Sequence, residues 1–265
     1  RPVYWLPGGG GLSVLAFREI SLLLGAERPV YGLEADLRLD GAHEDLPSMA
    51  RDYIQAIREE QPHGPYVLFG FSLGAWMAYE MAVQLREQGE EIALLGIFDT
   101  AVPGVLSGAQ QVTAVAQRFR HHWRNLTALP AGNMFSYVRD AAEVLALKMQ
   151  RQLGRPSAPS PSEATGSASS IFDQVDRRNR TIIHGYSHGP LSSYAGRATL
   201  FLAERTSQSG LSPDLDARLG WRNLAEGGLD VQKVPGSHLS MLEQPHVQGL
   251  ARVLRDCLER ADEVR

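Results

Sequence analysis

The sequence contains only one cysteine, Cys257, and this scarcity excludes an internal disulfide. Proteins without disulfides are typical of reducing compartments, so we expect a cytoplasmic protein. Long apolar runs are missing too: none reaches the roughly 18 residues that a membrane-spanning helix needs, and no membrane span is expected. Basic residues are not in excess either, because 26 Lys and Arg stand against 30 Asp and Glu, a net charge of −4. A nucleic-acid partner would call for a basic surface, so none is expected.

Hydrophobic residues, at 43% of the 265, are numerous enough for a substantial core. Short apolar runs alternate with helical patterns, which predicts an α/β fold with a mostly parallel central sheet flanked by helices on both faces. The predicted strands are Pro2–Leu6, Pro29–Leu33, Tyr66–Phe71, Ile92–Phe98, Ala198–Ala203 and Leu229–Val234. The predicted helices are Leu12–Leu24, Leu46–Glu60, Ala75–Gln88 and Gln244–Arg260. The chain enters a strand pattern almost at once and lacks an initial methionine, so we expect it to come from a longer polypeptide.

The alternation breaks between residues 102 and 196, where the pattern indicates a helical insertion. Within it, residues 154–170 consist only of Gly, Arg, Pro, Ser, Ala, Glu and Thr. Such a composition cannot bury enough apolar surface to become ordered, which predicts a disordered loop. This loop could be read as a linker between two domains. Because the candidate site residues lie on both sides of it, we expect a single domain over residues 1–265.

The most informative stretch is Gly70-Phe71-Ser72-Leu73-Gly74, which joins an apolar strand pattern to a helical one. This is the context of the Gly-x-Ser-x-Gly nucleophile elbow of α/β-hydrolases. Gly70 and Gly74 leave room where a side chain would collide in so tight a turn. The turn would set Ser72 at a helix N-terminus, where backbone N–H groups favour developing negative charge. A serine that merely caps the helix is the alternative, and the strand and helix on either side favour the nucleophile.

A serine nucleophile needs a histidine base, itself oriented by an acid. His238 follows the strand pattern Leu229–Val234 through Pro235–Ser237, predicted as a tight turn, and a final helix comes after it. This places His238 at the carboxyl edge of the sheet, where α/β folds bind ligands, and makes it the candidate general base. Six other histidines have polar surroundings, precede a helix or lie near the insertion: His43, His63, His121, His122, His184 and His188.

Two residues are candidates for the acid that orients His238. Asp99 ends the strand pattern Ile92–Phe98 and is the sole carboxylate near that strand end. Glu204 ends the next strand, the commoner position in α/β-hydrolases generally, with Asp214 and Asp216 beyond it. An acid in this role must be buried and close to the histidine. Because Glu204 neighbours Arg205 and is simply explained as part of a surface ion pair, the residues modestly favour Asp99.

The oxyanion hole needs two N–H donors. One is expected from Leu73, after the nucleophile, and the other from the glycine-rich loop that follows the first strand. Gly8 is the nearest amide after Pro7, with Gly9 second. The loop does not have the spacing of a phosphate-binding motif. No metal is expected, because serine catalysis does not need one, and no bound cofactor is expected.

Together these residues resemble the thioesterase domains of nonribosomal peptide synthetases and polyketide synthases. The resemblance rests on Leu6–Gly10, Pro29–Leu33, Met49–Ile54, Gly64–Gly74, Ala78–Ala82, Leu95–Asp99, Gly236–His238, Met241–Leu242 and Pro245–Val247. It implies that Asp99 is the acid, and that residues 102–196 form a lid over the acyl channel. It also implies that Ser72 accepts an acyl or peptidyl chain from the 4′-phosphopantetheine arm of a carrier protein. Because the chain is expected to come from a longer polypeptide, we expect that carrier protein in the same parent polypeptide. Release would follow by hydrolysis or macrocyclisation.

The chain departs from the family at two positions beside the nucleophile. Phe71 stands where tryptophan is usual, and Ala75, next to Trp76, stands where glycine is frequent. With Gly9, these three residues are candidates for substrate binding. Three other functions are compatible with the same motifs: a discrete thioesterase that clears misloaded carrier proteins, a carboxylesterase or lipase, and a non-catalytic docking module. The complete Ser72, Asp99 and His238 set argues against the last.

Overall fold

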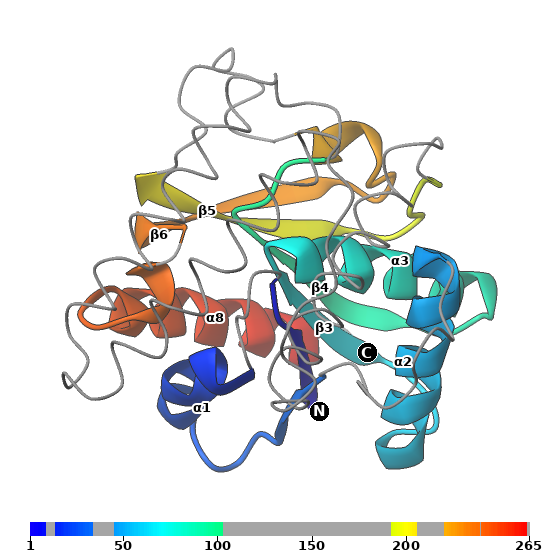
Figure 1. Ribbon diagram of the computed structural model, residues 1–265, viewed down its shortest axis with the longest axis horizontal. Coiled ribbons are helices and arrows are strands. Elements are labelled where there is room, and N and C mark those ends of the chain that lie inside the picture. The colour runs from blue at the N-terminus through cyan, green and yellow to red at the C-terminus, as the bar shows by residue number, and fades with distance from the viewer. Residues whose placement is uncertain (9–13, 34–44, 103–191, 206–219, 239, 264–265) are drawn as a thin grey trace, which may run out of the picture.

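Figure 1 shows the computed structural model of the chain, which describes residues 1–8, 14–33, 45–102, 192–205, 220–238 and 240–263. Within these residues, six strands form one sheet in the order β2-β1-β3-β4-β5-β6, and every pairing is parallel. The strands are β1 (Val3–Leu6), β2 (Val30–Gly32), β3 (Tyr66–Phe71), β4 (Ile92–Phe98), β5 (Ala198–Arg205) and β6 (Leu229–Ser237). The predicted parallel sheet is confirmed.

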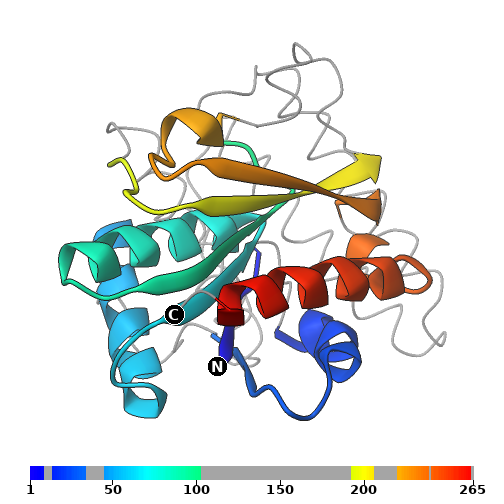
Figure 2. The same cartoon turned by 180° about the vertical axis from the view of Figure 1, so that it is seen from behind.

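Helices cover both faces of this sheet, as Figures 1 and 2 show from opposite sides. The helices α2 (Leu46–Glu60) and α3 (Leu73–Glu87) contact each other and share one hydrophobic core. On the opposite face, α1 (Arg18–Leu24) contacts α8 (His246–Glu263), and both contribute to a second core. Strand residues alternate between the two: Tyr4 lies in the first core, whereas Val3 and Trp5 lie in the second. Burial on both faces explains why the strands read as continuous apolar runs.

The element boundaries differ from prediction near the sheet edge that carries the candidate site. Helix α3 begins at Leu73, two residues earlier than predicted, so it follows Ser72 directly. Strand β6 continues to Ser237 instead of ending in a turn at Pro235. A register shift between β5 and β6, with Gly236 at a φ of 98°, accommodates the extra residues. At the N-terminal side, the described part of the predicted helix Leu12–Leu24 is a 3₁₀ turn, Val14–Phe17, followed by α1.

The large insertion falls between two strands that are neighbours in the sheet. Strands β4 and β5 pair directly, from Leu95 with Ala198 to Phe98 with Phe201, although most of residues 102–196 separates them in sequence. Residues 103–191, and with them the predicted loop 154–170 and almost all of the predicted lid, lie outside the described residues. No helix in the described parts of the chain is long and apolar enough to cross a membrane.

Candidate active site

Ser72 lies on a sharp turn between β3 and α3. It has the left-handed φ of 55° with a ψ of −124°, a conformation that side chains rarely adopt. The parallel strand before it and the 15-residue helix after it hold the turn in place. Such a strained serine between strand and helix is the geometry of a nucleophile elbow. The N-terminus of α3, the positive end of the helix dipole, is therefore adjacent to the Ser72 side chain.

The two glycines of the elbow are required by contacts with backbone. A Cβ at Gly70 would lie 2.3 Å from the Ala75 Cα, and one at Gly74 would lie 2.1 Å from the Leu6 carbonyl oxygen. Neither contact could be relieved by rotating a side chain. The strand, the elbow and the loop after β1 are thus packed against each other through main-chain atoms, which fixes the position of Ser72.

Asp99 and His238, the predicted acid and base, are in contact. The His238 Nδ1 lies 3.1 Å from Asp99 Oδ2 and also 3.1 Å from the main-chain oxygen of Asp99. A carbonyl oxygen can only accept, so Nδ1 carries the proton and donates it. In the neutral ring, Nε2 is then the unprotonated nitrogen, which is the tautomer that a general base requires.

Asp99 is held by backbone groups of β5. It is fully buried, and its φ of 44° places it in the left-handed region, which aspartate tolerates better than most residues. Its N–H donates to the Phe201 carbonyl at 2.9 Å, and its Oδ1 accepts from the Ala203 N–H at 3.1 Å. Both carboxylate oxygens therefore have partners, one from β5 and one from His238.

The His238 ring is held by a ring contact as well as by hydrogen bonding. It lies against the Phe71 ring, with centroids 4.8 Å apart and planes at 33°. The His238 side chain is 18% exposed, so solvent or a ligand can reach one side of it. Among the described residues, no hydrogen bond joins the Ser72 hydroxyl to this ring; β3 and β6 bring them to the same edge of the sheet. Catalytic hydrogen bonds of this kind are often formed only once substrate is bound.

Gly8, the predicted oxyanion donor, lies against the nucleophile. A Cβ at Gly8 would be 2.9 Å from the Ser72 Cβ and 3.2 Å from the Phe71 carbonyl oxygen, so only glycine fits. Leu73, the other predicted donor, is the first residue of α3, where N–H groups have no partner within the helix. The backbone of both residues thus borders Ser72, and their role in stabilising an oxyanion stays a prediction.

The remaining predicted residues are placed less directly. Gly9 lies outside the described residues, as do Asp214 and Asp216. Ala75 is fully buried behind the elbow, and the Trp76 Nε1 donates to the Ala101 carbonyl at 3.0 Å. Glu204 is exposed on β5, and the carboxylate beside His238 is that of Asp99.

Two residues near the site were not identified from the sequence. The Thr100 hydroxyl lies 2.8 Å from the Phe98 carbonyl oxygen and 3.2 Å from that of Ser72, which ties the acid strand to the elbow. The Nε1 of the buried Trp221, in the 3₁₀ turn Trp221–Asn223, donates to the Thr100 carbonyl at 2.6 Å. Neither residue stands in a recognisable motif. Only the adjacency of Thr100 to Asp99 could have drawn attention to it.

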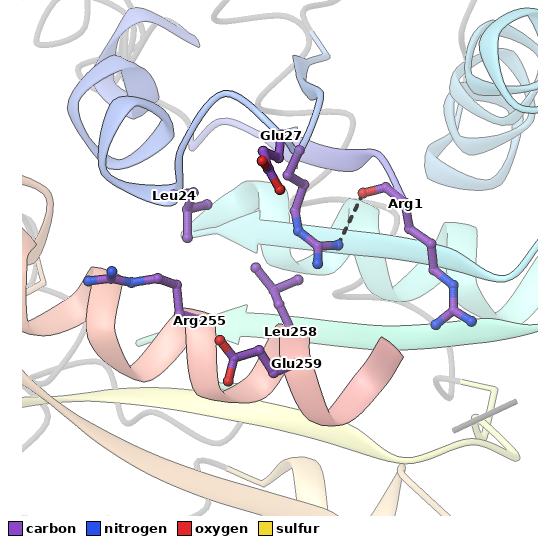
Figure 3. Close-up of a pocket in the computed structure, with 7 residues that line it drawn as sticks. Arg1, Leu24, Glu27, Arg255, Leu258 and Glu259 are labelled. Carbon is purple, nitrogen blue, oxygen red and sulfur yellow. Dashed lines mark hydrogen bonds between the residues drawn. The ribbon is translucent and has the colours of Figure 1, made fainter. Parts of the chain in front are cut away.

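A pocket of about 310 Å³ lies at a different place, between α1 and α8 (Figure 3). Leu24 and the charged residues Arg1, Arg255 and Glu259 are among the residues that line it, and Arg28 donates to the Arg1 carbonyl oxygen at 3.1 Å. None of the candidate site residues contributes to it. Among the described residues, no cluster of three or more histidine, cysteine or carboxylate side chains could hold a metal ion.

The strained serine after β3, the Asp99–His238 contact and the parallel sheet define the class of this protein as an α/β-hydrolase fold. The NocB thioesterase domain, solved as a covalent complex with a fluorophosphonate nocardicin G analogue, shares this fold with a TM-score of 0.62. The two are 23% identical, and the alignment covers 97% of this chain and 93% of that one.

The family follows from sequence. Residues 1–258 match the thioesterase domain family, and the chain belongs to it. Chondramide synthase cmdD of Chondromyces crocatus is 26% identical over 264 residues, covering 96% of this chain and 7% of that protein. Non-reducing polyketide synthase crz7 of Cladonia metacorallifera is 27% identical over 269 residues, covering 95% and 12%. The chain therefore corresponds to a small part of these curated relatives, and the predicted family is confirmed.

Proposed function

We propose that this domain is a serine thioesterase that releases an acyl, peptidyl or polyketide chain from a carrier protein. The chain would arrive as a thioester on the 4′-phosphopantetheine arm of a carrier domain in the same parent polypeptide. Membership of the thioesterase family supports this, as does similarity to short segments of large synthases. The arm is part of the substrate, and the chemistry needs no resident cofactor. We place the reaction in the cytoplasm, where a chain with a single, buried cysteine would not be oxidised.

The first half-reaction transfers the chain to Ser72. The Ser72 Oγ attacks the thioester carbonyl carbon while the His238 Nε2 accepts the hydroxyl proton. The tetrahedral intermediate collapses when the C–S bond breaks, and the leaving pantetheine sulfur takes the proton from His238. An acyl-Ser72 ester and a free pantetheine thiol result. Asp99 stabilises the imidazolium that forms in between, through the contact to Nδ1.

Negative charge on the carbonyl oxygen is stabilised by the backbone in this proposal. The N–H groups of Leu73 and Gly8 are the donors, because the backbone of both residues borders Ser72. The N-terminus of α3 adds a favourable field at the same point. No charged side chain is required for this step.

The second half-reaction releases the chain. Water, or a hydroxyl or amine of the chain itself, attacks the acyl-Ser72 carbonyl while the His238 Nε2 takes its proton. The bond to Ser72 Oγ then breaks, and that proton returns to the serine. Attack by water gives a free acid, and attack by an internal group gives a macrocycle. Which product forms depends on whether water or the internal group reaches the ester. We propose that residues 102–196 form the lid that controls this access. The lid and the site would belong to a single domain over residues 1–265.

The observation that carries the proposal is the hydrogen bond from the His238 Nδ1 to the buried Asp99, at the edge where β3 delivers Ser72. It sets the imidazole in the tautomer that can deprotonate the serine. A structural histidine would not need a buried carboxylate in this position.

The test is turnover of a panel of acyl-pantetheine thioesters, some with a terminal hydroxyl or amine, against oxygen esters of the same acyl groups. Products are identified by mass spectrometry. Thioester cleavage that is lost in Ser72→Ala supports the proposal, and a product lighter than the free acid by one water shows macrocyclisation. A preference for the oxygen esters would make the protein a carboxylesterase instead. Turnover that survives in Ser72→Ala would contradict the assignment of the nucleophile.

A further inference from the structure

The short loop that follows β4 is fixed at each of its first three residues. Asp99 is bound through its N–H to Phe201, as described above. The carbonyl groups of the next two residues, Thr100 and Ala101, both accept hydrogen bonds from tryptophan indoles. Asp99 needs this support, because its φ of 44° is unfavourable for a residue with a side chain.

The two indoles come from elements that are remote in sequence. Trp221 is fully buried in the 3₁₀ turn that precedes β6, and its Nε1 lies 2.6 Å from the Thr100 carbonyl oxygen. Trp76 is in the first turn of α3, and its Nε1 lies 3.0 Å from the Ala101 carbonyl oxygen. A buried indole N–H that donates over a short distance is a directional constraint on the backbone that it contacts.

The same loop is also connected to the nucleophile. The Thr100 hydroxyl lies 3.2 Å from the Ser72 carbonyl oxygen, so the residue that Trp221 holds contacts the elbow and directly follows Asp99 in the chain. A rotation of the peptide between Asp99 and Thr100 would move the main-chain oxygen of Asp99, which accepts from the His238 Nδ1. The orientation of that peptide therefore acts directly on the His238 ring.

From these contacts we propose that Trp221 is a positioning residue of the active site. Its indole N–H holds the Thr100 carbonyl, keeps Asp99 in its left-handed conformation and so presents two acceptors to the His238 Nδ1. The Trp76 indole N–H holds the carbonyl of the next residue, Ala101, in the same way. The inference rests on the proposed function, because it assigns the two indoles to the orientation of the catalytic base.

The experiment compares Trp221→Phe with Trp5→Phe in turnover of an acyl-pantetheine thioester. Both tryptophans are fully buried, but among the described residues the Trp5 Nε1 has no hydrogen-bond partner, so only Trp221→Phe removes a described bond. We expect Trp221→Phe to lower kcat by about tenfold or more with KM unchanged, as small misplacements of catalytic groups do. Trp5→Phe should retain the wild-type kcat. The low-field proton resonance of the His238 Nδ1–H should shift or broaden only in Trp221→Phe.

A double-mutant cycle with Asp99→Asn distinguishes an effect of Trp221 on the position of Asp99 from a general loss of structure. If Trp221 acts through Asp99, adding Trp221→Phe to Asp99→Asn should cost little further activity. A full additional loss in the double variant would overturn the inference, as would equal kcat values for Trp221→Phe and Trp5→Phe. Should Trp221→Phe not fold, Trp76→Phe is taken through the same cycle with the same expected outcome. Full activity of Asp99→Asn would instead contradict the proposed function itself.

Discussion

The Asp99 carboxylate accepts hydrogen bonds from the Ala203 N–H and from the His238 Nδ1. A substitution of equal size tests this hydrogen bonding without changing the packing. In Asp99→Asn the side chain keeps its size, but an amide can present its NH₂ to the His238 Nδ1 and so favour the wrong tautomer. We expect a fall in kcat on the order of 10⁴-fold, the size seen for the equivalent change in serine proteases. Steady-state turnover of a thioester measures it. Glu204→Gln is the matched control, and a comparable loss in that variant would show that the acid has been misassigned.

Gly74 is expected to tolerate no side chain at all. In Gly74→Ala the new Cβ would lie 2.1 Å from the Leu6 carbonyl oxygen, so the loop after β1 and the elbow would have to separate. Overpacking of this kind costs about 1–3 kcal/mol of unfolding free energy, and turnover should fall with it. Gln55→Ala, at an exposed position on α2, is the control and should melt like the wild type, because its side chain is not part of a packed contact. Thermal denaturation that shows equal losses for the two variants would contradict the steric argument.

The site residues differ in how far the sequence alone could identify them. Ser72 and His238 could be singled out because each follows a strand pattern and precedes a helical one, although the turn predicted before His238 is part of β6. Asp99 was favoured over Glu204 only modestly until the family resemblance was considered, because burial and contact with His238 depend on the folded sheet. Trp221 was not identified, since nothing in its neighbours signals an indole that reaches Thr100 across the molecule.

At the scale of elements, the sequence predicted the strands and helices well but misplaced several ends. Apolar runs buried on both faces were recognisable as strands of a parallel sheet. The end of β6 was missed because Pro235 and Gly236 read as a turn, whereas the register shift beside β5 allows both to remain in the strand. A bulge depends on the partner strand, so the local sequence could not reveal it.

The junction between α2, β3 and the turn before β4 depends on one carboxylate. Glu90 accepts hydrogen bonds from the Gly64 N–H at 2.8 Å and from the side chains of His63 and Arg58 at 3.2 and 3.3 Å. These donors, the Gly64 N–H first, hold the pKa of the Glu90 carboxyl below its usual value. A carboxyl whose pKa is lowered on folding stabilises the native state above its unfolded pKa. That contribution is lost as the pH falls through the lowered pKa.

We therefore expect Glu90→Gln to unfold at a lower temperature than the wild type at pH 7. The difference should shrink below about pH 4, as the wild-type carboxylate becomes protonated. Melting curves across this pH range measure both effects. The control is Glu59→Gln, at an exposed position on α2, which should match the wild type at every pH. A Glu90→Gln deficit that stays constant down to pH 2 would rule out this linkage.

At the scale of the whole molecule, the sheet is continuous across the large insertion. Strands β4 and β5 pair in register although residues 103–191 separate them, so the sheet joins parts of the chain on both sides of the insertion. After the insertion, the chain is bound to α3 at Ser192, whose carbonyl accepts a hydrogen bond from the hydroxyl of the buried Tyr79 at 2.7 Å. The insertion therefore begins and ends beside the elbow helix, where a lid would have to be attached.

Deletion of residues 156–169 should consequently leave the fold intact. This segment contains no aromatic or large aliphatic side chain, so it can contribute little to a hydrophobic core. We expect an unchanged melting temperature and unchanged labelling of Ser72 by a fluorophosphonate, with any effect confined to the range of acyl chains accepted. A large fall in melting temperature would show that the segment is an integral part of the domain.

The most direct test of the central claim is to detect the acyl chain on Ser72. The domain is mixed with an acyl-pantetheine thioester, quenched in acid within the first turnover, and examined by intact and peptide mass spectrometry. We expect a mass increase equal to the acyl group, located on the peptide that contains Ser72, and absent from Ser72→Ala. Asp99→Asn should form the same adduct much more slowly. Thioester cleavage without any adduct on Ser72, or with an adduct on another residue, would contradict the central claim.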